Sequence, residues 1–236
     1  MPPCIAVIHA TRAAVAPIEE AFERLWPEAE TIQLLDESLS RNLDQAGGLT
    51  AAMSDRIERL ARFGEDGGAD AILYSCSAFG TAIEAVQATM EIPVLKPNEA
   101  MLEEALEAGG KIRLAATFRP SIPSILKELR EMAARRGREV EAEPCFVPGA
   151  LDALLANDQE KHDALIAAAL GAEAPCGTVL LGQVSMARAL PAVAARVDTL
   201  VLSSPGSAVR RLRQVLALRS GHTPHSANQL ELEIVS

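Results

Sequence analysis

The chain has 236 residues, of which 49% are hydrophobic and 3% aromatic, and its net charge is −10 at pH 7. This composition can fill a hydrophobic core and excludes a chain that is disordered throughout. The negative charge argues against a nucleic-acid-binding surface, which needs a concentrated positive field. No apolar run approaches the roughly 18 residues of a membrane helix, and the N-terminus does not resemble a secretory signal. The four cysteines are too widely spaced for a zinc site or a disulfide scaffold. We therefore expect a reduced, cytoplasmic protein with no nucleic-acid or membrane partner.

Short apolar segments alternate with longer segments of helical period, which is the pattern of an α/β fold. Strands are expected over Cys4–His9, Thr31–Leu35, Ala71–Ser75, Pro93–Leu95, Ile112–Ala116, Val140–Phe146, Thr178–Gly182 and Thr199–Ser203. Helices are expected between them, for example over Pro17–Leu25, Leu49–Phe63, Ala78–Met90, Ser121–Arg136, Asp158–Leu170, Val184–Ala195 and Gly206–Leu218. Continuous apolar strands that alternate with helices predict parallel sheets covered on both faces.

An internal repeat is the most informative feature of the sequence. The segment ADAILYSCSAFGTAIEAV (69–86) matches CGTVLLGQVSMARALPAV (176–193) without a gap at a spacing of 107 residues. Near the start of the chain, Ala10-Thr11 matches Ala116-Thr117 and Pro17 matches Pro123, at a spacing of 106. Any strand–helix unit matches some apolar positions of another, but a repeat over most of the chain favours two similar lobes.

We predict two pseudo-symmetric, flavodoxin-like α/β lobes, each a parallel sheet flanked by helices, with a cleft between them. The first lobe is expected to comprise residues 1–98 and 206–236, and the second residues 99–205. Ligands of parallel α/β sheets bind at the carboxyl ends of the strands. Residues at matched strand ends of the two lobes should therefore converge on one ligand.

Cys76 is the strongest candidate for chemistry. It lies in Ser75-Cys76-Ser77, directly after an apolar strand and before a helix. The backbone N–H groups at the start of a helix favour a thiolate and would lower the pKa of the cysteine. A buried cysteine can also be simply a small core residue, which is the interpretation we prefer for Cys4, Cys145 and Cys176.

Hydroxyl groups at the other predicted strand ends are candidate carboxylate or oxyanion donors, although a hydroxyl before a helix is also an ordinary cap. Arg119 offers a possible bidentate clamp for a carboxylate. The acidic residues Glu103, Glu104 and Glu107 and the basic residues Arg210, Arg211 and Arg213 are expected to lie on solvated helix faces. No GxGxxG or P-loop pattern opens a helix, so a nucleotide site lacks support.

The segments ILYSCSAFGTAIEAV and VLLGQVSMARAL resemble the first and second cysteine motifs of the Asp/Glu/hydantoin racemase superfamily, which also includes maleate isomerases and arylmalonate decarboxylases. The resemblance extends to the segment around His9-Ala10-Thr11, to ATFRPSIPS (116–124) and to VLSSPGSAV (201–209). It implies two flavodoxin-like lobes, no pyridoxal phosphate, and two cysteines on opposite faces of a substrate carbon. We expect no other cofactor, and no metal because His222 and His225 have no helical spacing to a ligand partner. Members of this group are often oligomers, so a homo-oligomer is possible.

The sequence departs from that family at the second cysteine, where it has Gln183. An amide forms hydrogen bonds but does not exchange a proton near neutral pH. Three alternatives remain open. Cys76 can act alone on one face, His9 can serve as the second acid/base because histidine titrates near neutrality, or the protein binds a ligand without turnover.

The sequence thus predicts a cofactor-independent racemase or isomerase that acts on a small carboxylic or amino acid by thiol-based proton transfer. The alternatives are a single-thiol decarboxylase or lyase and a non-catalytic binding protein for small acids. Cys76 and His9 are the predicted catalytic residues. The predicted substrate-binding residues are Thr11, Ser77, Ala78, Thr117, Gln183, Val184, Ser185 and Ser203.

Overall fold

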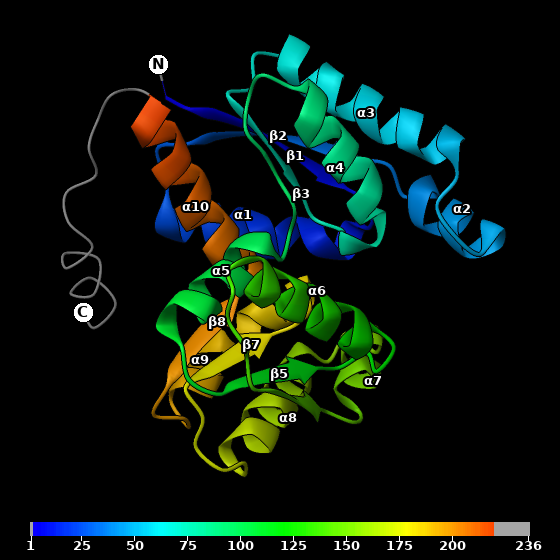
Figure 1. Ribbon diagram of the computed structural model, residues 1–236. Coiled ribbons are helices and arrows are strands. Elements are labelled where there is room, and N and C mark those ends of the chain that lie inside the picture. Colours follow the sequence, from blue (N-terminus) through cyan, green and yellow to red (C-terminus); the bar gives the residue numbers. More distant parts are fainter. Residues whose placement is uncertain (1, 220–236) are drawn as a thin grey trace.

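The computed structural model describes residues 2–219 and contains two sheets of four parallel strands each (Figure 1). The strands of the first sheet lie in the order β2-β1-β3-β4 and those of the second in the order β6-β5-β7-β8. Their bounds are β1 Cys4–His9, β2 Glu30–Leu35, β3 Ala71–Tyr74, β4 Val94–Leu95, β5 Ile112–Ala116, β6 Ala142–Phe146, β7 Thr178–Leu181 and β8 Leu200–Ser203. The expected α/β fold with two parallel sheets is confirmed.

The helices follow the strands as expected, with four differences. Their bounds are α1 Val15–Leu25, α2 Ser38–Ala46, α3 Ala51–Asp66, α4 Gly80–Thr89, α5 Glu99–Ala108, α6 Ser121–Arg135, α7 Ala150–Leu155, α8 Gln159–Gly171, α9 Leu190–Ala194 and α10 Ser204–Arg219. The helices α2, α5 and α7 were not among those we specified. The segment expected as one helix over Val184–Ala195 is divided into a 3-10 helix, η3 (Val184–Ala189), and the short α9.

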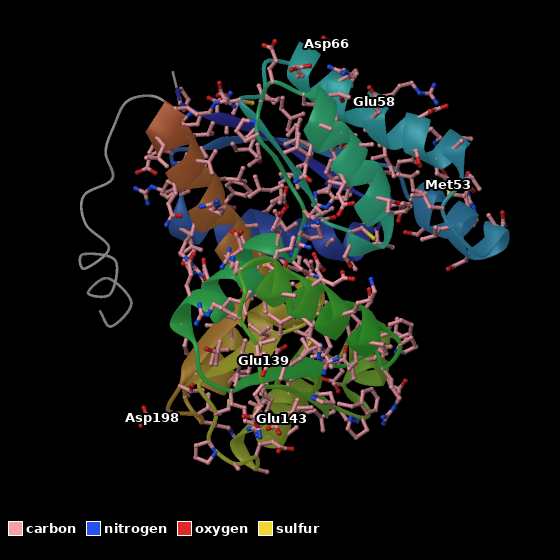
Figure 2. The ribbon with its side chains drawn as sticks, viewed as in Figure 1. Met53, Glu58, Asp66, Glu139, Glu143 and Asp198 are labelled. Atoms are coloured by element: carbon pink, nitrogen blue, oxygen red, sulfur yellow. The ribbon has the colours of Figure 1, made fainter. Side chains whose placement is uncertain are left out.

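The first sheet is covered by helices on both faces. Residues Ala6 and Ile8 of β1 pack in one core with residues of α3 and α4, whereas Ile5 and Val7 pack in a second core with residues of α1 and α10. This alternation follows from the pleat of a strand, in which successive side chains leave opposite faces. In Figure 1, α1 and α10 occupy the face of the first sheet that is nearer the second lobe, while Asp66 marks the outer end of α3 (Figure 2).

The second sheet has the same layered arrangement. Residues of α5 and α6 pack on one face, together with Leu114 and Leu180. Residues of α7, α8 and α9 pack on the other face, together with Ala115 and Leu181. The layer formed by α5 and α6 is the one that lies nearer the first lobe (Figure 1).

The strand pairing shows that the sequence repeat has a structural basis. Ile5 pairs with Ala71 in the first sheet, and Ile112 pairs with Thr178 in the second, each 107 positions later in the chain. The match of Ala10-Thr11 with Ala116-Thr117 at a spacing of 106 is therefore one residue out of register with the strands, in which His9 corresponds to Ala116. That spacing holds for the helices, in which Pro17 and Pro123 are each the third residue of α1 and α6. The loop after β5 is shorter by that one residue.

The helices α5 and α10 contact each other at the junction of the lobes. Glu104 of α5 accepts hydrogen bonds from Ser207 (2.9 Å) and Arg210 (2.7 Å) of α10. Arg211 lies 3.8 Å from Glu103. The expectation of solvated helix faces is thus wrong for Glu104 and Arg210, which are half-buried where the two helices meet. It is confirmed for Glu107, Arg211 and Arg213, which are exposed.

The packing of α10 and α5 shows to which sheet each helix belongs. Ala208, Val209 and Leu212 of α10 belong to the core that contains Ile5 and Val7 of the first sheet. Met101 and Leu102 of α5 belong to the core of the second sheet. Residues 220–236, which we placed in the first lobe, lie outside the described residues. None of the helices in residues 2–219 is both long and apolar enough to span a membrane.

Candidate active site at the carboxyl ends of the strands

Cys76 lies where β3 ends and a 3-10 turn, η2 (Ser77–Phe79), begins. It is half-buried, while Ser77 and Ala78 are exposed. Together with seven other first-lobe residues it lines a cavity of about 10 Å³, roughly the space of one water molecule. These residues are Ile8, His9, Ala10, Leu39, Ile57, Tyr74 and Phe79. The surroundings of the sulfur are therefore mainly apolar.

The protonation of Cys76 differs from what its position in the sequence predicts. Burial raises the pKa of the thiol above its ordinary value, and the backbone N–H of Ala78, which donates to the sulfur, lowers it by a smaller amount. The expected low pKa of a cysteine at a helix start is wrong here, because desolvation of the thiolate outweighs one backbone donor. Cys76 is accordingly a neutral S–H group at pH 7.

His9 ends β1 and is completely buried. Its Nε2 lies 2.7 Å from Oε1 of Gln33, and Nε2 of Gln33 donates to Oγ1 of Thr31 at 3.1 Å. Because the amide of Gln33 presents its oxygen to the ring, Nε2 of His9 carries the proton and Nδ1 is a bare acceptor. Burial lowers the pKa of His9, while the bond to Gln33 and the charge of Glu19 raise it by less. The ring is therefore neutral.

The side chains of His9 and Cys76 are supported by different cores, although both residues line the small cavity. Along β1, His9 lies on the same face of the sheet as Ile5 and Val7, whose core includes residues of α1 and α10. Cys76 packs against the core on the other face, which includes residues of α3 and α4. Ser75 precedes Cys76 and lies beside β1, since its N–H donates to the carbonyl of Ile8. The hydroxyl of Ser75 and Nδ1 of His9 are both buried without a hydrogen-bond partner.

Gln183 follows β7 at the position that corresponds to Cys76. Its Oε1 accepts hydrogen bonds from the backbone N–H of Thr117 (2.8 Å) and from the Thr117 hydroxyl (3.2 Å), and its Nε2 donates to Oγ of Ser121 (2.7 Å). The structure thus brings together Thr117 and Gln183, two predicted site residues. The amide ties the end of β7 to the first turn of α6, and one of its N–H groups has no partner among these three contacts.

The remaining predicted residues lie around the junction of the lobes. Val184 and Ser185 are half-buried in η3, which contacts α1, α10 and the 3-10 turn η1 (Arg12–Ala14) after Thr11. Val184 packs against the core of the first lobe. Thr11 is exposed, and Ser203 is buried at the end of β8. The carboxyl ends of β1 and β7 therefore approach each other across the lobes.

Three residues of this region were missed by the sequence analysis: Ser121, Gln33 and Ser75. Ser121 and Gln33 are recognisable only through their partners, since a serine at a helix start and a glutamine in a strand are unremarkable in a sequence. Ser75 was considered only as a neighbour of the cysteine. Its near-complete burial, at 6% exposure, and its unpartnered hydroxyl distinguish it in the structure.

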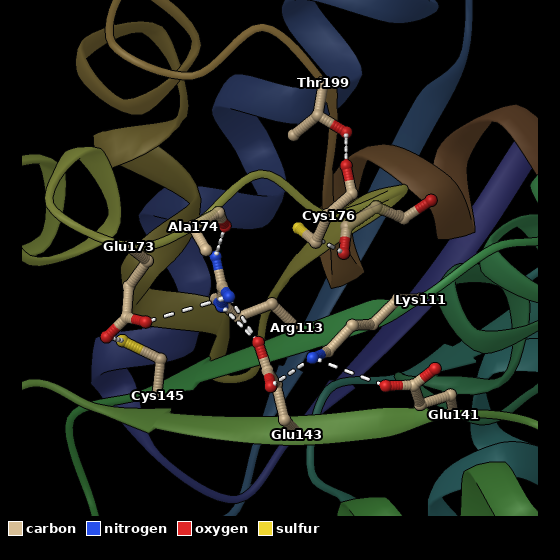
Figure 3. A network of polar contacts seen from close by, with 10 residues as sticks. Lys111, Arg113, Glu141, Glu143, Cys145, Glu173, Ala174, Cys176 and Thr199 are labelled. Carbon is tan, nitrogen blue, oxygen red and sulfur yellow. Dashed lines mark hydrogen bonds and ion pairs between the residues drawn. The ribbon is translucent and has the colours of Figure 1, made fainter.

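A second polar network lies near the opposite, amino-terminal edge of the second sheet (Figure 3). Arg113, a buried residue of β5, donates to Glu143 and to the carbonyl of Ala174. Lys111 lies 2.7 Å from the same Glu143. Cys145 and Cys176 flank this network (Figure 3). Among residues 2–219, no group of three or more acidic, histidine or cysteine side chains is arranged to hold a metal ion.

Comparison with solved structures shows the same fold in several racemases. An allantoin racemase from Klebsiella pneumoniae matches with a TM-score of 0.67 and 19% identity, over 94% of this chain and 90% of that chain. An aspartate racemase homologue from Pyrococcus horikoshii OT3 matches with a TM-score of 0.66 and 16% identity, over 92% of this chain and 100% of that chain. An arylmalonate decarboxylase matches with a TM-score of 0.58 and 18% identity, over 90% and 92%.

Sequence comparison assigns the family. No curated protein sequence matches the chain significantly. The family model described as Asp/Glu/hydantoin racemase matches residues 5–212, which include both sheets and both strand ends discussed above. The chain therefore belongs to the Asp/Glu/hydantoin racemase family of enzymes.

Proposed function

We propose that this protein transfers a proton to the carbon next to the carboxylate of a small carboxylic acid, with Cys76 as the proton donor on one face of that carbon. The observation that carries the proposal is the neutral, half-buried thiol of Cys76 at the carboxyl end of β3. The corresponding position of the other lobe holds the amide of Gln183, which has no acidic proton. A neutral thiol is an acid, and an acid is what a developing enolate needs.

The reaction that fits one acid is decarboxylation. The bond between the α-carbon and a departing carboxylate breaks, carbon dioxide leaves, and the electron pair remains on an enolate. The S–H of Cys76 then supplies a proton to that carbon, and water restores the thiol. The apolar surroundings of Cys76 suit this step, because a localised carboxylate charge, which depends most on solvation, becomes the delocalised charge of an enolate.

Gln183 has a positioning role in this proposal. Its amide is committed to Thr117 and Ser121, so it holds the second-lobe strand end in place and retains one N–H to donate to a carboxylate or enolate oxygen. The backbone N–H groups of the turns after β3 and β7 are further donors at the same edges.

Racemisation is the second candidate, and one observation favours it. His9 is neutral with an unpartnered Nδ1, so it is a base, while Cys76 is an acid. A base on one side and an acid on the other satisfy the requirement for inversion at the α-carbon. It requires the substrate to reach both groups, although they are supported by opposite faces of the first sheet.

The experiment combines a panel of small mono- and dicarboxylic acids with four proteins: wild type, Cys76→Ala, His9→Gln and, as a matched control, Cys4→Ala. Cys4 is also half-exposed but lies at the amino end of β1. Carbon dioxide release and loss of optical rotation are followed separately.

The proposal expects carbon dioxide release that is lost in Cys76→Ala, by about 10²-fold or more, and retained in Cys4→Ala. Racemisation that depends on both Cys76 and His9 would select the second candidate. Turnover that survives Cys76→Ala would contradict both.

A further inference from the structure

A second hollow lies beside the site, on the second lobe. Its volume is about 360 Å³, and it is lined by Arg119, Ile122, Pro123, Pro144 and Phe146. Three of these residues follow Thr117 in the loop after β5 and the first turn of α6, and the other two belong to β6. The hollow is thus adjacent to the segment that holds Gln183. It is large enough for a small organic acid, unlike the cavity beside Cys76.

The guanidinium of Arg119 is oriented by an aromatic ring. Its Cζ lies 3.9 Å from the centroid of the Phe146 ring, which is cation–π geometry. A guanidinium stacked on a ring keeps its N–H donors free at the edge of the plane, where they bind a carboxylate bidentately. Part of the conformational entropy that a flexible arginine loses on binding has already been lost here.

Arg119 differs from the arginine in the corresponding loop of the first lobe. Arg12, in the turn after β1, is paired with Glu37 at 2.9 Å. Within residues 2–219, Arg119 makes no ion pair, and the hollow that it lines contains no acidic side chain. A cation without a counterion, set in walls of isoleucine, proline and phenylalanine, is complementary to an anion that carries an apolar body.

We propose that this hollow binds a small carboxylate with a branched aliphatic body, with Arg119 on the carboxylate and Ile122, Pro123 and Pro144 against the hydrocarbon. The inference goes beyond the proposed function, since it concerns a ligand site on the second lobe and not the chemistry at Cys76. The binding itself does not require turnover.

The test is a titration with 4-methylpentanoate, followed by calorimetry and by amide chemical shifts. Acetate supplies the charge without the body, and 4-methylpentan-1-ol supplies the body without the charge. The proteins are wild type, Arg119→Gln, Phe146→Leu, Cys76→Ala and the control Arg12→Gln. Arg119 is exposed, so its replacement does not endanger folding.

The inference expects 4-methylpentanoate to bind wild type more tightly than acetate and the alcohol, with shifts in residues 119–123 and 144–146. Arg119→Gln should weaken binding by about tenfold or more, since a hydrogen bond to a charged group is lost. Phe146→Leu should weaken it less, and Arg12→Gln should leave it unchanged.

Equal affinity in wild type and Arg119→Gln, or equal binding of the acid and the alcohol, would overturn the inference. The two proposals fail separately. If Cys76→Ala keeps both turnover and binding, the proposed function is contradicted and the ligand site in the hollow is supported. If turnover depends on Cys76 but Arg119→Gln does not weaken binding, the proposed function is supported and the ligand site is contradicted.

Discussion

At the scale of single residues, the site is governed by competition between burial and backbone donors. Cys76 directly precedes the three-residue 3-10 turn η2, which leads into α4, and one N–H, that of Ala78, reaches its sulfur. A longer helix would present several N–H groups and a larger dipole to the thiolate. The apolar contacts of Cys76 therefore determine its protonation, and they make it an acid.

The first prediction concerns the alkylation of Cys76. Only the thiolate reacts with iodoacetamide, and a raised pKa reduces the thiolate fraction at every pH below it. In a protein whose Cys4, Cys145 and Cys176 are replaced by alanine, the alkylation rate measured by mass spectrometry should rise at a higher pH than in the same chain unfolded in urea. A midpoint below that of the unfolded chain would contradict the neutral thiol.

The second prediction concerns His9 and acid stability. Because burial lowers its pKa in the folded state, the unfolded chain binds the proton first as the pH falls below about 6.5. The free energy of unfolding should therefore decrease from pH 7 towards pH 5, by at most about 1.4 kcal/mol per pH unit from this group. Urea denaturation of His9→Gln should show a shallower decrease over this range. An unchanged slope would show that folding does not lower the pKa of His9.

The third prediction concerns the amide of Gln183. Gln183→Leu keeps much of the side-chain volume but leaves the buried N–H and hydroxyl of Thr117 without their acceptor. The expected loss is about 1–3 kcal/mol in the free energy of unfolding. Gln214→Leu, on the exposed face of α10, is the matched control and should change stability by about 0.5 kcal/mol or less. Equal effects in the two variants would show that the Gln183 contacts are weak.

At the scale of elements, the sheets require close approach of helices and strands. A Cβ on Gly64 of α3 would lie 2.5 Å from the Cβ of Ala6 in β1. The helix therefore packs on the first sheet at a distance that only glycine permits. Gly80, the first residue of α4, has open space around its Cα.

These two glycines provide the fourth prediction. Gly64→Ala should lower the free energy of unfolding by about 1–3 kcal/mol, because overpacking forces α3 away from the sheet. Gly80→Ala should leave stability unchanged or raise it slightly, since alanine is the better helix former. Thermal denaturation of both variants measures the difference, and a Gly64→Ala protein as stable as Gly80→Ala would disprove the tight packing.

The strands were predictable from the sequence to within one or two residues, because continuous apolar runs bounded by turns have few alternatives. The segment after β7 was not. Its apolar spacing suits one helix over Val184–Ala195, but the 3-10 helix η3 ends at Ala189 and a new helix, α9, begins with Pro191 in its first turn. Proline favours the first turn of a helix, so its position marks a start within the predicted helix.

At the scale of the whole molecule, the sequence repeat predicted two lobes, and the order of strands is the same in both sheets. The repeat did not predict the contacts between the two lobes. The pairing of acidic α5 with basic α10 depends on two helices that are distant in sequence, and each looks like a solvated helix when considered alone.

The candidate site was predicted in part for the same reason. Residues at strand ends follow from topology, which places Cys76 and Gln183 at corresponding positions. The partners of those residues do not follow from it, because Ser121 and Gln33 are set by side-chain directions that a repeat does not encode. The result is a symmetric scaffold with an asymmetric pair of strand ends, one with a thiol and one with an amide.

The most direct test of one-sided protonation is turnover in deuterated water, with the configuration of the labelled product determined by NMR in a chiral environment. The account predicts one deuteron per product molecule, on a single face of the α-carbon, with no deuterium in recovered substrate. Deuterium on both faces, or label washed into unreacted substrate, would show that a second group exchanges protons and would contradict Cys76 as the sole donor.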